Sequence, residues 1–183
     1  HEEGVLHPVT FELIGKAREL AAVIRQPVRV LLMGGGVSQA AHELLHYGAD
    51  EVYVCDDPAL RHFSIEPYAA VFEAFIAQTR PAAILVGATA VGRQLAPRVA
   101  ARLKTGLTAD CTVLEMNENT DLVQIRPAFG GNIMAEIVTP NHRPQMATVR
   151  YKVMNAPERS PHSSGQIVSL HVDPTRLKGG VQA

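Results

Sequence analysis

Three short apolar runs, each bounded by Gly, Pro or Asp, alternate with longer segments of helical periodicity in the first half of the chain. The apolar runs cover residues 28–33, 52–55 and 82–86. Short apolar runs of this length are typical of strands that are buried on both faces of a parallel sheet. The periodic segments predict helices over residues 8–24, 38–47, 66–79 and 93–104. This alternation predicts right-handed βαβ units and an open, doubly wound α/β sheet with helices on both faces.

The pattern changes after Leu107, where short strand-like runs are joined by turns instead of helices. These runs predict strands over residues 111–116, 122–125, 133–138, 147–153 and 166–172. The segment Asn117-Glu-Asn-Thr120 is the clearest hairpin loop, because Asn residues favour tight turns. The second half of the chain is therefore predicted to be antiparallel or mixed.

The length of 183 residues fits one domain, which would bury about 70% of the surface that its unfolded chain exposes. The predicted division is an α/β platform domain at 1–156, a polar loop at 157–165, the final strand of the same domain at 166–173 and the start of a linker at 174–183. A helix that leaves a parallel sheet normally follows a strand. We therefore expect a first strand upstream of the helix that opens at Pro8.

Charge and cysteine usage exclude several classes of protein. A net charge of −1 and a pI near 6.8 leave no excess of basic surface, so nucleic acid and anionic membranes are not predicted partners. No apolar run reaches the length of a membrane span. Cys55 and Cys111 lie in separate apolar segments, which predicts buried thiols in a reducing compartment. That compartment is expected to be the cytoplasm of a bacterium or archaeon, ahead of the mitochondrial matrix. The histidines show no spacing for zinc.

The loop Gly87-Ala-Thr-Ala-Val-Gly92 follows a predicted strand and opens a predicted helix. Free backbone N–H groups and the helix dipole at such a place could hold a phosphate or a carboxylate. The candidate binding residues are Gly87, Thr89, Gly92 and Arg93. The loop is neither a G-x-G-x-x-G motif nor a P-loop. The alternative is that its glycines only permit a tight strand-to-helix turn.

A second loop, Gly34-Gly-Gly36, has the same position after a predicted strand, and Ser38 is predicted to cap the helix that follows. A purely structural turn is again the alternative. If a nucleotide enters the domain, the two loops are where the carboxyl ends of neighbouring strands would meet it.

Arg126 stands beside Pro127 at the end of a predicted strand. Its guanidinium keeps its proton and can donate a fork of hydrogen bonds to a phosphate or carboxylate. A structural ion pair is an equally open interpretation. The following Gly130-Gly131-Asn132 predicts a tight turn.

Two further features have structural interpretations. Arg98 and Arg102 lie four residues apart on one predicted helix, and they predict a basic stripe that is solvated or faces another subunit. Cys111 follows Asp110 but has no histidine tied to it by sequence. We therefore expect a buried thiol rather than the nucleophile of an acyl-transfer enzyme.

Four segments together resemble the N-terminal domain of the α subunit of electron transfer flavoproteins. They are Gly87–Leu103, Thr105–Thr112, Arg126–Ala135 and Asn141–Arg150, and the resemblance runs from about Pro8 to Val172. It implies a Rossmann-like fold of the adenine nucleotide α hydrolase type, with antiparallel strands in the C-terminal half. It also implies a heterodimer with a β subunit, and a carrier that takes electrons from acyl-CoA or other dehydrogenases instead of converting a substrate itself.

The same resemblance implies FAD in the full-length complex, held mainly by a mobile C-terminal domain with a Ser-Gly-Gly-Arg-type segment that this chain does not contain. The chain alone is therefore expected to hold no FAD tightly and to show no activity. In similar proteins the β subunit holds AMP or, where electrons are bifurcated, a second FAD near the arginine that matches Arg126. A cation there would favour the anionic reduced flavin. The alternative is a stand-alone adenine-nucleotide-binding domain that uses both glycine loops.

Overall fold

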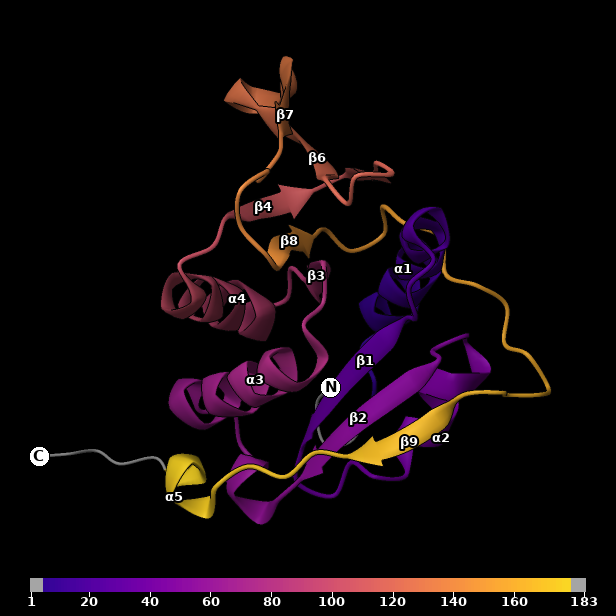
Figure 1. Cartoon of the computed structure of the whole chain (residues 1–183), viewed down its shortest axis with the longest axis vertical. Helices are drawn as coiled ribbons and strands as arrows, with labels where there is room; N and C mark the ends of the chain where they lie inside the picture. The colour runs from indigo at the N-terminus through magenta and orange to yellow at the C-terminus, as the bar shows by residue number, and fades with distance from the viewer. Residues whose placement is uncertain (1–4, 179–183) are drawn as a thin grey trace, which may run out of the picture.

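The computed structural model describes residues 5–178 (Figure 1). Its α-helices are α1 (Val9–Ile24), α2 (Ala40–His46), α3 (Ile65–Thr79), α4 (Ala90–Leu103) and α5 (Pro174–Leu177). Its strands are β1 (Arg29–Gly34), β2 (Glu51–Asp56), β3 (Ala83–Gly87), β4 (Leu107–Cys111), β5 (Val113–Met116), β6 (Leu122–Ala128), β7 (Ile133–Ile137), β8 (Gln145–Val149) and β9 (Gln166–Ser169). Two short 3₁₀-helices are η1 (Pro58–Leu60) and η2 (Phe129–Gly131).

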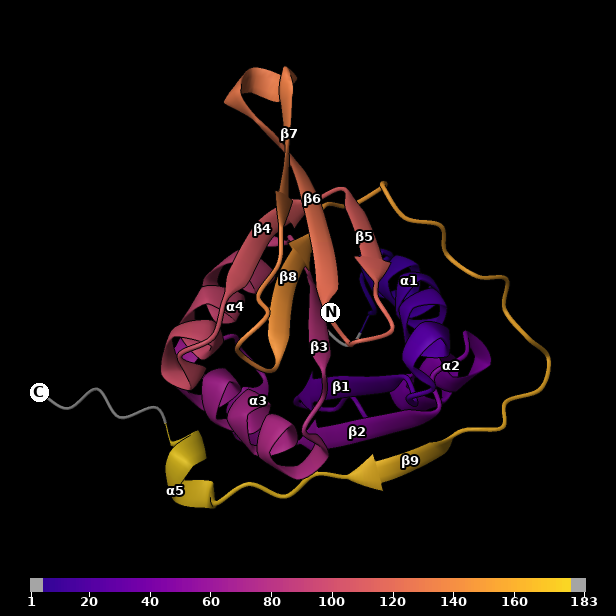
Figure 2. The ribbon, with the colours of Figure 1, turned by 45° about the horizontal axis from the view of Figure 1, so that its top comes forward.

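Hydrogen bonding arranges the described strands in three sheets of three strands each. The sheets β1-β2-β9 and β3-β8-β4 are parallel throughout, and the sheet β5-β6-β7 is antiparallel. Figure 2 shows β3, β8 and β4 side by side, with the hairpin of β6 and β7 reaching away from them. The predicted fold class, parallel sheets flanked by helices with antiparallel strands in the second half, is confirmed.

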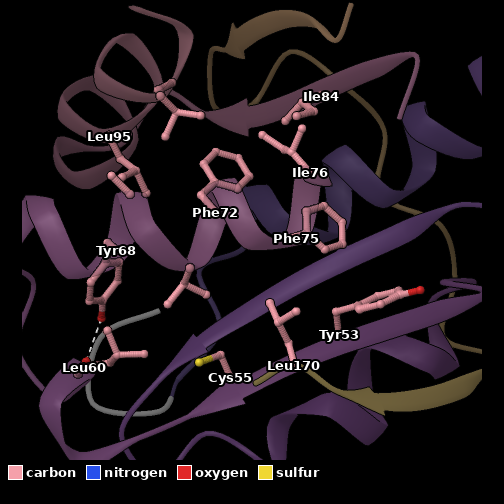
Figure 3. Packing of buried hydrophobic residues seen from close by; sticks show 14 of the residues in the cluster. Tyr53, Cys55, Leu60, Tyr68, Phe72, Phe75, Ile76, Ile84, Leu95 and Leu170 are labelled. Carbon is pink, nitrogen blue, oxygen red and sulfur yellow. Dashed lines mark hydrogen bonds between the residues drawn. The ribbon is translucent and has the colours of Figure 1, made fainter. Parts of the chain in front are cut away.

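Alternate residues of β2 face different helices, as expected for a strand that is buried on both faces. Val52 and Val54 belong to an apolar cluster with α1 and α2. Tyr53 and Cys55 belong to the larger cluster that α3 and α4 form on the other face. In that cluster the rings of Tyr53 and Phe75 meet edge to face, with centroids 5.2 Å apart (Figure 3). The apolar run at 52–55 therefore contributes to two cores at once.

Ion pairs join α3 to α4. Arg98 Nη2 lies 2.5 Å from Glu66 Oε1, and Arg102 pairs with both Glu66 and Glu73. Arg98 and Arg102 share one face of α4 as predicted, but that face meets acids of the neighbouring helix. Arg98 stays exposed, as the prediction of a solvated stripe requires. The sequence did not predict the ion pairs, because the carboxylates lie 32 and 29 positions away on the neighbouring helix.

The strand β4 was not predicted from the sequence. Polar Thr108 and Asp110 interrupt its apolar pattern, and its register with β8 shifts between Thr108 and Cys111. Asp110 has a left-handed φ of 59° within that shift. The strands β8 and β9 overlap the runs predicted at 147–153 and 166–172, but β8 begins two residues earlier and ends at Val149. Both strands pair in parallel with strands that lie far away in the sequence. The second half is therefore mixed.

The segment 157–165 contains no helix or strand but is anchored to α2. Arg159 Nε donates to Glu43 Oε1 at 2.9 Å, and the Ser160 amide donates to the His46 carbonyl at 2.8 Å. The predicted linker from residue 174 begins instead with α5, whose Leu177 is buried in the cluster around α3. Residues 179–183 of that linker lie outside the described residues.

Candidate functional site at the carboxyl end of the second parallel sheet

The loop between β3 and α4 is tightly packed, through contacts among its own residues and with α1. Thr89 caps α4, because its Oγ1 accepts a hydrogen bond from the Gly92 amide at 3.1 Å. A Cβ on Gly92 would lie 1.9 Å from the carbonyl oxygen of Gly87. A Cβ on Gly87 would lie 2.6 Å from Cγ1 of Val9 in α1. Both glycines therefore have a packing role, and anion binding by the remaining amides of the loop stays a prediction.

Arg93 folds back over this loop. Its Nε donates to the Ala88 carbonyl at 3.0 Å, and its Nη1 donates to Oδ2 of Asp110 at 2.9 Å. Asp110 in turn is held at the end of β4, where its amide donates to Thr148 Oγ1 at 2.9 Å. The second carboxylate oxygen of Asp110, Oδ1, is buried without a hydrogen-bond partner. The Arg93–Asp110 pair therefore leaves one buried acceptor unused at the site.

Arg126 lies in β6, opposite Ala135 of β7. Within residues 5–178 its guanidinium makes no ion pair and no side-chain hydrogen bond. Burial raises the pKa of the nearby Cys111, and the positive charge of Arg126 opposes part of that rise. Both arginines, Arg93 and Arg126, therefore lie near the end of β4. Arg93 pairs with Asp110, and the charge of Arg126 is felt by Cys111. The structural ion pair that the sequence left open for Arg126 is not formed with any residue in this part of the chain.

Cys111 is fully buried, and its Sγ lies 3.6 Å from the Thr108 carbonyl. Burial raises the pKa of its thiol to about 11, against the opposing charge of Arg126, and Asp110 adds to the rise. The thiol is therefore protonated at neutral pH and is no nucleophile. The prediction of a buried Cys111 is confirmed.

The raised pKa of Cys111 predicts a loss of stability at high pH. Below pH 9 the thiol is protonated in the folded and unfolded chains alike, so its contribution is fully present. Between pH 9 and pH 11 the unfolded chain ionises first, because the folded pKa is about 11 and the ordinary value is 9.0. We expect the free energy of unfolding to fall by about 2 to 3 kcal/mol over this window. Urea unfolding at several pH values would measure it, and Cys111→Ala should lack this component of the fall. An equal fall in both proteins would contradict the prediction.

Backbone amides of the second glycine loop donate hydrogen bonds to a carboxylate of the same chain. Asp56, at the end of β2, accepts from the amides of Gly36 at 2.6 Å and Ser38 at 2.9 Å. It also accepts from the Ser38 hydroxyl at 2.6 Å, and this bond is the first cause of the lowered pKa of Asp56. Ser38 therefore does not cap α2, whose N-cap is Gln39, and that prediction was wrong. An anion would have to displace Asp56 from these amides, which disfavours the stand-alone nucleotide-binding alternative.

The hairpin formed by β6, η2 and β7 projects away from the parallel sheets (Figure 1). Three large apolar side chains are exposed on it: Phe129 at 84%, Ile133 at 55% and Met134 at 53%. Gly130 and Gly131 have positive φ at its tip, so the predicted tight turn is confirmed. Nothing in the sequence separated these apolar residues from core residues, because exposure depends on whether another layer covers the hairpin. Contiguous exposed apolar side chains mark interaction surfaces.

The fold and this site define a class of protein. It is an α/β domain with an exposed apolar hairpin and with an arginine, Arg126, that has no acid partner within residues 5–178. The electron transfer flavoprotein domain matches residues 1–175. The chain belongs to the electron transfer flavoprotein domain family, and the resemblance seen in the sequence is confirmed.

Curated relatives are similar over nearly all of this chain. The lactate dehydrogenase (NAD(+),ferredoxin) subunit LctC of Acetobacterium woodii is 64% identical over 100% of this chain and 44% of the relative. The electron transfer flavoprotein subunit alpha of Megasphaera elsdenii is 50% identical over 91% of this chain and 49% of the relative. The acryloyl-CoA reductase electron transfer subunit beta of Anaerotignum propionicum is 41% identical over 93% and 53%. The chain thus spans about half the length of these relatives.

Two further kinds of site are absent from the described residues. No helix between residues 5 and 178 is long and apolar enough to cross a membrane. The same residues contain no group of three or more His, Cys, Asp or Glu side chains that could hold a metal ion.

Proposed function

We propose that the chain is the platform domain of an electron transfer flavoprotein α subunit. It pairs with a β subunit in a flavin-based carrier that takes electrons from acyl-CoA or other dehydrogenases and passes them to a further acceptor. Family membership supports this role, as do the names of the relatives from Megasphaera elsdenii and Anaerotignum propionicum. The two buried, unpaired cysteines support a reducing compartment, which we propose is the cytoplasm.

The observation that carries the proposal is the exposed hairpin. Phe129, Ile133 and Met134 would remain in water in an isolated domain, and large apolar residues gather at the centres of protein interfaces. We propose that the β subunit packs on this hairpin. Arg126 lies on β6 within the same hairpin, so the docked subunit would meet both the apolar side chains and the guanidinium.

The residues present fit an anionic group such as a flavin or a nucleotide phosphate. Arg126 has a guanidinium with no acid partner in residues 5–178, and α4 begins at the same end of the sheet. We propose that Arg126 holds a flavin or nucleotide of the β subunit, with Gly87, Thr89, Gly92 and Arg93 as further candidates. FAD, when bound in the complex, takes up two electrons and releases them singly or together. Arg126 supplies a permanent positive charge that favours the anionic reduced form.

We further propose that the assembled protein bifurcates electrons. The relative from Acetobacterium woodii carries both NAD(+) and ferredoxin in its name. We propose that the longer protein to which this domain belongs divides electrons between two acceptors, with FAD in the complex and a second FAD in the β subunit. AMP in place of that second FAD is the outcome expected if electrons are not bifurcated.

An affinity pull-down tests the proposal. The tagged chain is used as bait in lysate of its source organism, and retained proteins are identified by mass spectrometry. Retention of an electron transfer flavoprotein β subunit is the expected result. Failure to retain it, with a bait whose circular dichroism shows it to be folded, would count against pairing by this domain. Saturable binding of AMP or ATP to the chain alone would instead support the nucleotide-binding alternative.

Substitution at the tip of the hairpin should weaken this retention. Phe129 has a positive φ of 47°, a conformation that Asn tolerates, so Phe129→Asn removes the apolar ring with little cost to the fold. We expect at least about a tenfold weaker affinity for the β subunit, as typical of an aromatic residue at an interface centre. The matched control is Val23→Gln, which removes an apolar side chain that is 45% exposed on α1. Equal affinities of the Phe129→Asn and Val23→Gln chains would argue against docking at the hairpin.

Loss of the charge at Arg126 should lower the potential of a bound flavin in the assembled complex. Without the guanidinium the anionic reduced form is less stable, so Arg126→Ala should shift a two-electron half-potential downward by about 30 mV for each 1.4 kcal/mol lost. Arg126→Lys keeps the charge and should retain most of the potential. Arg98→Ala removes a charge that pairs with Glu66 and should change nothing. Unchanged half-potentials of every bound flavin in Arg126→Ala would refute the role. Spectroelectrochemical titration measures them.

A further inference from the structure

A polar hollow of about 380 Å³ lies at the amino ends of β1, β2 and β9. Val28, Asp50 and Ser164, which stand shortly before these three strands, all line it. Its other walls come from α1, from the end of α2 and from the segment 157–165, which passes beside α2 on its way to β9 (Figure 2). The polar side chains on those walls include Arg18, Gln26, His46, Glu158, His162 and Ser163. The hollow shares no residue with the candidate site at the carboxyl end of the second parallel sheet.

Arg18 brings a positive charge to this hollow. Within residues 5–178 its guanidinium makes no ion pair and no hydrogen bond. Gly48 gives it room, because a Cβ at Gly48 would lie 2.7 Å from Cδ and 2.9 Å from both Nε and Nη1 of Arg18. The guanidinium therefore lies against bare backbone at the wall of the hollow. Its planar fork of N–H donors matches the oxygens of a phosphate.

The segment 157–165 forms a rim that is fixed to α2 and has donors to spare. Its Arg159 and Ser160 are bonded to α2, as described above. The Ser160 hydroxyl is already used, because it donates to the His162 carbonyl at 2.7 Å and accepts from the His162 amide at 3.2 Å. The hydroxyls of Ser163 and Ser164 make no hydrogen bond to any residue that the structure describes. They are therefore available to a ligand.

His46 adds a hydrogen-bond acceptor. Its Nδ1 lies 2.8 Å from the carbonyl oxygen of Ser160. A carbonyl can only accept, so Nδ1 carries the hydrogen and Nε2 of the neutral ring is left with a lone pair. Among the described residues nothing bonds to Nε2. A ligand that uses the whole hollow must therefore accept hydrogen bonds from Arg18 and donate one to His46.

Hydrogen phosphate combines these two properties. Its charged oxygens accept strong hydrogen bonds from a guanidinium, and its remaining hydroxyl can donate to an imidazole nitrogen. Sulfate is of similar size and charge, but it has no hydroxyl at neutral pH and cannot donate. The mixture of donors and acceptor in the hollow therefore favours a phosphate over a sulfate.

Two carboxylates also line the hollow. Asp50 is engaged by the backbone, since its Oδ2 accepts from the Val28 amide at 2.7 Å. Glu158 is exposed and has no cation partner in the part of the chain that the structure describes. Glu158 therefore opposes an anion in the hollow, because like charges repel. Loss of Glu158 should strengthen the binding of an anion, whereas loss of Arg18 should weaken it.

We propose that this hollow is a binding site for a phosphate group that keeps one hydroxyl, with inorganic hydrogen phosphate as its simplest ligand. Arg18 binds the charged oxygens, His46 accepts a hydrogen bond from the hydroxyl, and Ser163 and Ser164 donate from the rim. The site does not depend on the flavin role of the domain, because its residues lie at the opposite ends of other strands.

Calorimetric titration of the chain with inorganic phosphate, in a buffer free of other oxyanions and at low ionic strength, tests the proposal. We expect saturable binding of one phosphate. Arg18→Gln should weaken it by at least about tenfold, because a charge-assisted hydrogen bond to the ligand is lost. Glu158→Gln should tighten it by about twofold, as an exposed charge does at close range. Sulfate should bind more weakly than phosphate.

The matched control is Arg80→Gln. Arg80 is also exposed and unpaired within residues 5–178, and its replacement changes the net charge equally, but it lies at the end of α3 and does not line the hollow. Equal weakening by Arg18→Gln and Arg80→Gln would overturn the site, as would the absence of saturable phosphate binding. Equal affinities for sulfate and phosphate would overturn the role of His46 and, with it, the choice of phosphate. In NMR spectra of the chain, phosphate should shift the amide signals of Gly48 and Ser163 but not that of Gly130.

Discussion

Gly92→Ala is expected to destabilise the domain by at least about 3 kcal/mol. The new Cβ would lie 1.9 Å from the Gly87 carbonyl oxygen and 3.1 Å from Cγ1 of Val86. The nearer contact is with backbone, which cannot rotate away as a side chain can. The first turn of α4 would have to move away from the end of β3 and would carry the Thr89 cap with it. Urea unfolding followed by circular dichroism measures the loss.

Gly130→Ala is the matched control for this substitution. Nothing lies within 4 Å of a Cβ at Gly130, but its φ of 72° is left-handed. Its cost should therefore be the conformational term alone, about 1 to 2 kcal/mol. If Gly92→Ala costs no more than Gly130→Ala, close packing at the start of α4 is not what requires glycine there.

Gln145→Leu should have a comparable effect through hydrogen bonds instead of packing. The side chain of Gln145 is fully buried at the start of β8. Its Oε1 accepts from the Leu122 amide at 2.7 Å, and its Nε2 donates to the carbonyls of Thr120 at 2.7 Å and Ala82 at 3.3 Å. Leucine has a similar volume but would leave these three backbone groups without that partner. We expect a loss of about 3 kcal/mol in the free energy of unfolding.

Gln94→Leu separates this effect from any general cost of replacing glutamine. Gln94 is exposed on α4, and its Nε2 donates to the Ala90 carbonyl at 3.0 Å. The substitution should change the stability by no more than about 0.5 kcal/mol. Hydrogen exchange should also speed up at the Leu122 amide in Gln145→Leu alone. Similar stabilities of the two variants would show that the Gln145 bonds contribute little.

The parts of the fold that could be predicted were those with a strong local period. The helix predicted over 66–79 is observed as Ile65–Thr79, because alternation of buried and solvated faces is a property of neighbouring residues. The run 52–55 was recognised as a strand with two buried faces because all four of its residues are apolar. In contrast, β4 was missed, since Thr108 and Asp110 take their partners from β6, β8 and α4. Those partners lie 16 to 38 positions away.

In the candidate site, too, the residues could be predicted from the sequence but their distant partners could not. The β3–α4 loop and Arg126 were singled out from residue type and position, which suffice to say that an amide or a guanidinium could hold an anion. Asp110 was not included in the site, although its side chain pairs with Arg93. The acid that holds the second glycine loop, Asp56, was also not found, because it lies 18 positions after Ser38 on another strand.

The sequence by itself determined the α/β class, the places of nearly all helices and strands, the burial of both cysteines and the family to which the chain belongs. These depend on local periodicity and on residue identity. Only the tertiary structure decided which edges pair, which charges neutralise one another and which apolar side chains stay in water. Phe129 and Phe75 are the same residue type, yet one is 84% exposed and the other 5%. The difference arises because burial is decided by what packs across a residue, and that comes from distant parts of the chain or from a partner.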